Sequence, residues 1–196
     1  REVQQIELSQ GETSLTSALS GWVPTSERST IWVTSTPYGR SFDHLKYLLR
    51  YPYGCIEQTT SSTRPLLYLS KFIALVDPET VAKAGNVEAM VKSGIDRVLS
   101  MQTADGGFGY WPGESSSPWG SAYATHMLID AKEQGFDVPE QRLQDAVTYL
   151  EATVENIAAG RTSEWHRDTE AYMHFVLARA GKPKKALALR YAEALQ

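Results

Sequence analysis

The chain has 196 residues, which is enough for one domain with a sizeable hydrophobic core. Its apolar and charged fractions are those of a globular protein, and a formal net charge of −4 gives no basic surface, so we expect no nucleic-acid partner. The one cysteine, Cys55, excludes an intrachain disulfide and a cysteine-rich metal site, and we expect neither a metal nor a cofactor.

The first forty residues differ from the rest of the chain. The segments 3–8 and 29–36 are rich in β-branched residues and partly alternate, and glycines and prolines separate them. This pattern is typical of short strands. We expect two or three strands over residues 1–40, and they should belong to a larger β module, because so short a sheet is not stable by itself.

From Ser41 onward the apolar residues recur at helical spacing. Pro65 is well placed as the first residue of a helix, and Ser117 as the cap before another. Gly135 and Gly181 stand where helices are expected to end. The expected helices span about residues 41–50, a stretch starting near 55, and 65–76, 87–101, 118–134, 139–154, 168–180 and 184–196.

The predicted helices come in pairs joined by short loops, which is typical of an α/α solenoid or toroid. The segment 122–129 is apolar on two faces, as a helix inside such an array would be. The last helix reaches the chain end without a cap and is apolar on more than one face. We therefore expect a mainly α fold for residues 41–196, a truncated, partial α/α toroid whose exposed flank makes the fragment self-associate.

The segment from Gly54 to Gln58 carries the chemistry. Residues three apart in the first turn of a helix are neighbours, so the sulfur of Cys55 can reach the carboxamide carbon of Gln58. A helix N-terminus favours the thiolate, which is the nucleophilic form. Attack with loss of ammonia gives a thioester ring that Gly54 lets the backbone enter without a Cβ clash. The alternative for a lone cysteine is a small buried hydrophobic residue.

A thioester is an activated acyl group that nucleophiles can attack. A lysine amine opens it to an isopeptide bond and a hydroxyl opens it to an ester, whereas water destroys it. The bond therefore has to be kept dry until it is needed. The aromatic residues Tyr51 and Tyr53 could supply part of that shield.

The longer string over residues 51–60, Tyr-Pro-Tyr-Gly-Cys-Ile-Glu-Gln-Thr-Thr, resembles the thioester region of the α2-macroglobulin and complement family. Isoleucine after the cysteine and threonine after the glutamine are similar to the bacterial branch. The resemblance continues through residues 101–111 and 117–123 and covers roughly residues 41–180. Residues 1–40 look similar to the β linker module that precedes the thioester domain in this family.

The resemblance implies a role for each residue of the motif. Cys55 and Gln58 match the thioester pair, and Gly54 matches the glycine before it. Glu57 matches the acid between them, and it would accept hydrogen bonds from backbone donors near the ring. The alternative for Glu57 is a solvated acid in the first helical turn, which the helix dipole favours.

Two tryptophans and four histidines are further candidates. Trp111 and Trp119 bracket a serine-rich loop, and we favour packing between helix layers, with lining of the thioester pocket by one of them as the alternative. In complement components a histidine steers the acyl group toward hydroxyls. The histidines of this chain are His44, His126, His166 and His174.

None of these histidines matches the complement loop. His166 and His174 are the candidates by position, but His174 and His126 fit packed positions in helices, and His44 fits a helix surface. We therefore assign no catalytic histidine. On this basis amines are expected to be favoured over hydroxyls as targets.

The leading function implied by the resemblance is that of the acyl donor in a bacterial α2-macroglobulin-like protease inhibitor. A protease cuts a bait region elsewhere in the full protein, the thioester is exposed, and a protease lysine is captured. There is no turnover, so the chain is not an enzyme. Its partners are proteases and the other domains of the parent protein.

Three alternatives remain open. One is a thioester adhesin or opsonin-like surface tag, and another is a scaffold that has lost its thioester. The third is a toroidal prenyl or terpene enzyme, because the loop 105–109 resembles the repeat of those enzymes. The chain lacks, however, their acidic clusters and zinc ligands.

No stretch of the sequence approaches the roughly 20 apolar residues of a membrane helix. We expect a periplasmic or extracytoplasmic location, with anchoring of the parent protein left open.

Overall fold

The structure, a computed structural model, describes residues 53–76, 86–160 and 167–194, together with single positions and short stretches between residues 6 and 33. The chain divides into two compact units, residues 1–39 and 40–196. The strands expected over 3–8 and 29–36 lie largely outside the described residues, and the helix expected over 41–50 lies wholly outside them. The assignment of residues 1–40 to a β linker module stays a prediction.

The described part of the chain is helical. Its only β feature is an isolated bridge between Gln102 and Phe108. The mainly α fold is therefore confirmed. The helices are α2 (Ile56–Val76), α4 (Val87–Leu99), α5 (Pro118–Glu133), α6 (Glu140–Ala158), α7 (Arg167–Arg179) and α8 (Lys185–Glu193). None of the described helices is long and apolar enough to cross a membrane.

One predicted boundary is wrong. Pro65 was expected to begin a helix, but α2 starts at Ile56 and runs through Pro65 without a break. An internal proline removes one backbone hydrogen bond and crowds the carbonyl four residues before it. Tertiary packing overrides this cost, because Leu66 and Leu67 are buried in the core directly after the proline.

The helix caps agree with the sequence. Ser117 precedes α5, and its side chain accepts a hydrogen bond from the backbone N–H of Gly120. Asn86 caps α4 in the same way, through bonds from the N–H groups of Glu88 and Ala89. These short-range contacts fix where the helices start and therefore where the loops between them lie.

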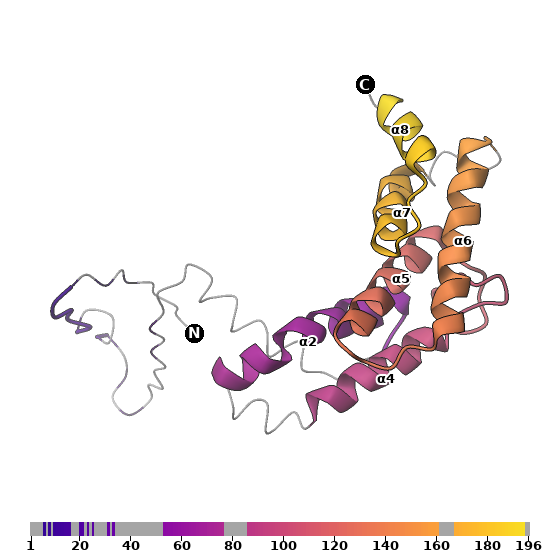
Figure 1. The fold of residues 1–196 in the computed structure, drawn as a ribbon. Helices are drawn as coiled ribbons and strands as arrows, with labels where there is room; N and C mark the ends of the chain where they lie inside the picture. The colour runs from indigo at the N-terminus through magenta and orange to yellow at the C-terminus, as the bar shows by residue number, and fades with distance from the viewer. Residues whose placement is uncertain are drawn as a thin grey trace. The chain divides into compact units, whose positions relative to one another are not determined.

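The helices of residues 40–196 pack in two layers (Figure 1). In one layer α5 lies between α2 and α7 and packs against both. In the other layer α4 packs on α2 and α5, and α6 packs on α5 and α7, while α8 contacts α6 and α7. Helices α2 and α4 run side by side in opposite directions. This arrangement agrees with the predicted helix pairs, whereas closure into a toroid stays a prediction.

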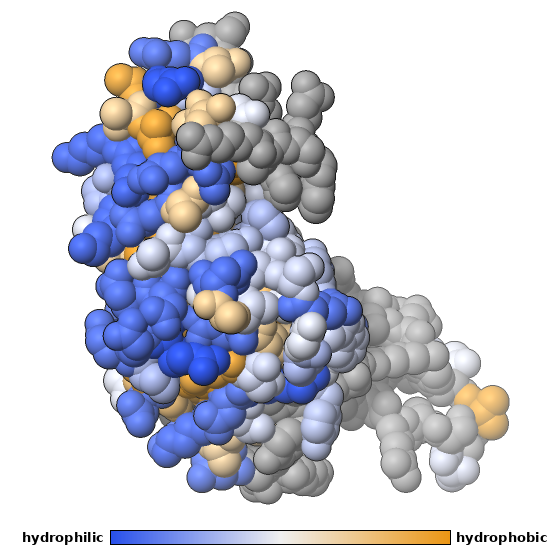
Figure 2. Space-filling view, turned by 90° about the vertical axis from the view of Figure 1, so that its right-hand side faces the viewer, coloured by the Kyte–Doolittle hydropathy of each residue, from blue (hydrophilic) through white to orange (hydrophobic). Residues whose placement is uncertain are grey.

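The number of buried faces on each helix follows from the place of that helix in the two layers. The central helix α5 is buried from Gly120 to Ala131 except at Tyr123, as its apolar residues on two faces predicted. Helix α6 instead buries a single stripe of residues three or four apart, formed by Leu143, Ala146, Val147, Leu150 and Val154. Figure 2 shows one face of the molecule, which is largely hydrophilic, with hydrophobic residues in separate spots.

The loop between α4 and α5 is held by hydrogen bonds both at a buried side chain and in its turn. Phe108 is completely buried, and its backbone N–H donates to the hydroxyl of Ser121 at 2.8 Å. Asp105 accepts bonds from the hydroxyls of Thr103 and Ser116 and from the N–H of Gly107. Burial tends to raise the pKa of Asp105, but these hydrogen bonds outweigh it and hold the pKa below its usual value. The loop thus contains the turn that its Asp-Gly-Gly sequence predicted, and a purely architectural role stays a prediction.

Candidate thioester site

The segment from Gly54 to Gln58 forms the start of α2. The carbonyl of Cys55 accepts the first helical hydrogen bond, from Thr59 N–H at 2.9 Å, so Cys55 is the cap residue. The Gln58 side chain, three residues on, reaches back, and its Oε1 accepts a bond from the Cys55 N–H at 3.3 Å. This is the glutamine half of a capping box. Cys55 and Gln58 therefore meet in the first turn of α2, through the backbone of the cysteine and the side chain of the glutamine.

Gly54 makes room for this contact. Its φ of +125° lies in a region that favours glycine. A Cβ at this position would lie 2.2 Å from Oε1 of Gln58 and 2.9 Å from its Cβ. The glutamine side chain therefore lies over the α carbon of Gly54, and any larger residue would displace it. The predicted need for glycine at this position agrees with the geometry.

The backbone around Cys55 is held from three sides. The N–H of Ile56 donates to the carbonyl of Tyr110 at 3.0 Å, which ties the start of α2 to the loop before α5. The carbonyl of Gly54 accepts a bond from Arg97 of α4 at 3.3 Å and one from the Thr59 hydroxyl at 3.4 Å. The site is therefore anchored by tertiary contacts and not only by its own helix.

This arrangement fits acyl chemistry. A backbone N–H can only donate, so the carbonyl oxygen of Gln58 faces the N–H of Cys55. Such a bond polarises the carboxamide for attack at its carbon. Cys55 is the residue whose N–H makes this bond, so its thiol and the carboxamide belong to the same helical turn. The formation of a thioester here stays a proposal.

Of the other predicted motif residues, Glu57 and Tyr53 have exposed side chains. Glu57 is exposed in the first turn of α2, as the solvated acid would be, and the described residues give it no backbone donor as a partner. Tyr53 is 77% exposed. Tyr51 lies outside the described residues, so its shielding role stays a prediction.

The two tryptophans take different positions. Trp111 is exposed, and its backbone N–H donates to Glu114. Trp119 packs against Tyr123, with ring centroids 5.8 Å apart, and against Tyr172 at 5.3 Å. Trp119 is 36% exposed, and it packs on its own helix and on α7 in the same layer. The predicted packing between helix layers is therefore not what these contacts show. A pocket-lining role for either tryptophan stays a prediction.

Helices α2, α5 and α7 are joined by a buried acid that the sequence did not single out. Asp130 of α5 is completely buried, and it accepts a bond from Nε of Arg64 on α2 at 2.6 Å. Arg179 of α7 donates to its other oxygen at 3.0 Å and to Glu133 at 2.6 Å. Because one carboxylate meets two guanidinium groups, Asp130 ties α2 and α7 to the helix α5 that lies between them.

His126 belongs to this cluster and is buried, as predicted. Its Nε2 lies 2.9 Å from a nitrogen of Arg64, and its Nδ1 lies 2.8 Å from the hydroxyl of Tyr172. A guanidinium can only donate, so Nε2 accepts and Nδ1 carries the proton. Burial, and then the charge of Arg64, lower the pKa of His126, although Asp130 opposes them. Burial also raises the pKa of Tyr172 to about 12.

The lowered pKa of His126 predicts a loss of stability in mild acid. The unfolded histidine, with a pKa of about 6.5, binds a proton before the folded one does. Stability present at neutral pH is therefore lost as the pH falls through about 6.5 toward the folded-state pKa. We expect the thermal midpoint to drop between about pH 7.5 and about pH 5.5, and His126→Gln to drop less over this window. Equal drops in both proteins would contradict the assignment.

The remaining histidines offer no catalytic group within the described residues. His174 is buried beside Glu170, 3.6 Å away, as the packed position predicted. His44 and His166 lie outside the described residues. The decision to assign no catalytic histidine therefore stays a prediction.

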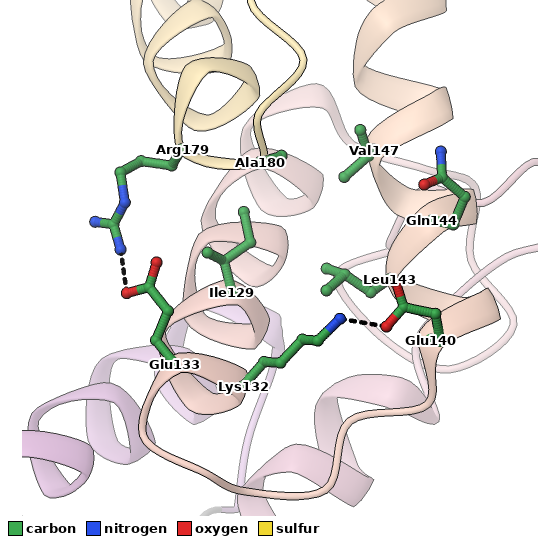
Figure 3. Close-up of a pocket in the computed structure, with 9 residues that line it drawn as sticks. All are labelled: Ile129, Lys132, Glu133, Glu140, Leu143, Gln144, Val147, Arg179 and Ala180. Atoms are coloured by element: carbon green, nitrogen blue, oxygen red, sulfur yellow. Dashed lines mark hydrogen bonds and ion pairs between the residues drawn. The ribbon is translucent and has the colours of Figure 1, made fainter.

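A cavity of about 280 Å³ lies between α5, α6 and α7 (Figure 3). Apolar side chains of Ile129, Leu143 and Val147 point into it, and two ion pairs, Lys132 with Glu140 and Arg179 with Glu133, stand at its rim. Neither Cys55 nor Gln58 lines it. The cavity is therefore separate from the candidate thioester site.

Comparison with known proteins places this geometry in a family. The A-macroglobulin TED domain model matches residues 29–177. Alpha-2-macroglobulin of Escherichia coli strain K12 is 37% identical over 101 residues, which cover 49% of this chain and 6% of that protein.

Solved structures agree with this match. Salmonella alpha-2-macroglobulin reacted with methylamine superposes with a TM-score of 0.66 and 31% identity, covering 78% of this chain and 10% of that chain. Trypsin-activated alpha-2-macroglobulin of Escherichia coli gives a TM-score of 0.61 and 28% identity, covering 74% and 10%. This chain thus spans a tenth or less of the length of these relatives. Because the family model matches well over half of the chain, the chain belongs to the alpha-2-macroglobulin TED domain family, as the resemblance over residues 51–60 predicted.

Proposed function

We propose that Cys55 and Gln58 form an internal thioester, and that the natural protein uses it as a single-use acyl donor to trap proteases. The observation that carries the proposal is the contact between the Cys55 N–H and Oε1 of Gln58, at 3.3 Å, above a glycine that leaves it room. The thiol of Cys55 attacks the carboxamide carbon, a C–S bond forms, and the C–N bond breaks. The nitrogen leaves as ammonia and carries away the thiol proton.

The second step consumes this bond. A primary amine attacks the thioester carbon, an amide forms, and the Cys55 thiol is released. One relative was crystallised after reaction with methylamine, a small primary amine, and another after activation by trypsin. A lysine side chain of a protease is the same kind of nucleophile. Activation of one relative by a protease supports protease capture in preference to a thioester adhesin or opsonin-like surface tag.

The remaining parts of the proposal concern the natural protein as a whole. The acyl group is spent in one reaction, so the protein acts as an inhibitor and not as a turnover catalyst. It works in the periplasm or outside the cytoplasm, where it meets foreign proteases. As an isolated piece, the chain would self-associate through apolar side chains such as Leu189 of α8, which is 61% exposed.

Replacement of the nucleophile tests the proposal. In the full-length natural protein, Cys55→Ala is expected to abolish covalent capture of an added protease, because no thioester can form without the sulfur. The free energy of unfolding should fall by only about 1 kcal/mol, since a small half-buried side chain is shortened. The measurement is the amount of protease that stays attached under denaturing conditions.

Ser61→Ala serves as the matched control. Ser61 is exposed on the same helix, and its hydroxyl lies 3.1 Å from that of Tyr123. Within the described residues, this hydroxyl makes no hydrogen bond to Cys55 or Gln58. Capture by this variant should match the unchanged protein. Undiminished covalent capture by Cys55→Ala would refute the proposed function.

A further inference from the structure

Arg97 lies at the candidate thioester site, although it is 42 positions from Cys55 in the sequence. It stands in the last turn of α4 and donates to the carbonyl of Gly54 at 3.3 Å. The guanidinium is half-buried, and a hydrogen bond from a charged donor is stronger than one between neutral groups. Among the described residues, it is the only charged side chain that bonds to the backbone of the segment from Gly54 to Ile56.

The packing of α4 on α2 aims Arg97 at this carbonyl. Gly94, one turn before Arg97, is buried, and a Cβ there would lie 2.1 Å from the hydroxyl oxygen of Thr63 on α2. The two helices therefore approach closely at this point. Because residues three apart share a helix face, Arg97 also faces α2, and it lies one turn nearer the loop that joins α4 to α5. The arginine is thus placed by the helix pair and not by a flexible loop.

The bond from Arg97 bears directly on the reacting groups. The carbonyl of Gly54 and the N–H of Cys55 belong to one planar peptide group. A donor that fixes the carbonyl therefore also fixes the direction of the N–H, which points at Oε1 of Gln58 at 3.3 Å. When the Cys55 sulfur attacks the carboxamide carbon, negative charge develops on Oε1, and a fixed N–H beside it stabilises that charge.

We propose that Arg97 is a positioning residue for thioester formation, which holds the Gly54–Cys55 peptide so that its N–H polarises the Gln58 carboxamide. This inference rests on the proposed function. Arg97 touches none of the reacting atoms, and it acts through the peptide group alone. The chemical step remains the one given above, in which a C–S bond replaces a C–N bond and ammonia leaves.

The test measures how fast the newly folded full-length protein loses one ammonia, by intact mass after timed cell-free synthesis, with each value normalised to the folded fraction. We expect Arg97→Met to slow this loss by roughly 100-fold, since misplaced catalytic groups have effects of this size. Arg97→Lys keeps a cationic donor and should recover part of the rate.

Arg142→Met is the matched control. Arg142 of α6 also donates to a backbone carbonyl at the end of α4, that of Leu99, at 2.7 Å, but it does not contact the segment from Gly54 to Ile56. Its removal should leave the rate of ammonia loss close to that of the unchanged protein. If Arg97 only stabilised the fold, Arg97→Met and Arg142→Met should change the rate of ammonia loss to a similar extent.

The outcomes separate the two proposals. If the unchanged protein loses ammonia and Arg97→Met does so equally fast, or no more slowly than Arg142→Met, the inference about Arg97 is overturned and the proposed function stands. If the unchanged protein never loses ammonia, the proposed function falls and the role of Arg97 falls with it.

Discussion

Gly54→Ala is expected to abolish thioester formation while leaving the helical fold in place. The new Cβ would lie 2.2 Å from Oε1 of Gln58, far inside van der Waals contact, so the carboxamide has to leave the N–H of Cys55. Loss of this alignment should slow ring closure by roughly 100-fold or more, so that no ammonia is lost in the time that the unchanged protein needs to close its ring. A side chain at a φ of +125° adds strain of about 1–3 kcal/mol, which a domain of this size can tolerate.

Gly113→Ala is the matched control for Gly54→Ala. Gly113 also has a positive φ, +86°, but a Cβ there would meet no atom within 4 Å. The control therefore introduces backbone strain without a clash at Gln58. Intact mass should show loss of ammonia in the Gly113 variant and none in the Gly54 variant. A Gly54 variant that loses ammonia as fast as the unchanged protein would mean that the carboxamide does not react in the orientation described.

Asp130→Ala is expected to be the most destabilising of the proposed substitutions. The aspartate is completely buried and joins α2 to α7 through Arg64 and Arg179. Removal of one partner from a buried ion pair leaves unpaired charge. Because both arginines are about a third exposed, part of this cost is relieved by water. The free energy of unfolding should fall by about 2–4 kcal/mol, measured by denaturant unfolding.

Glu133→Ala provides the comparison for the buried acid. Glu133 bonds to the same Arg179 at 2.6 Å, but its side chain is 50% exposed. Exposed pairs contribute about 0–1 kcal/mol, so this variant should unfold almost like the original protein. Equal destabilisation by the two variants would show that burial of Asp130 does not decide its contribution.

Much of the helical fold could be predicted from the sequence, because short-range signals set the helix ends. Ser117 caps α5, and the start of α2 beside Cys55 follows from a glutamine three residues on. The helix start predicted at Pro65 is wrong. The preference of proline for the first turn of a helix was outweighed by the packing of the two leucines that follow it.

The supports of the candidate site could not be predicted, since they join distant parts of the chain. Arg97 bonds to a carbonyl 43 positions away, and Arg64 to an acid 66 positions away. Nothing in their local sequence separates these arginines from surface ones. The Tyr110 contact to Ile56 uses a backbone carbonyl, which any residue could supply. The proposed reactive pair could be recognised because Cys55 and Gln58 are close in the sequence.

The mass of the natively folded, full-length natural protein tests the central claim most directly. A thioester between Cys55 and Gln58 predicts an intact mass below the sequence mass by one ammonia. Treatment with methylamine should then add one methylamine and free one thiol, because the amine replaces the sulfur on the acyl carbon. A protein whose mass equals its sequence mass, and whose Cys55 thiol is free before any amine is added, would contradict the account.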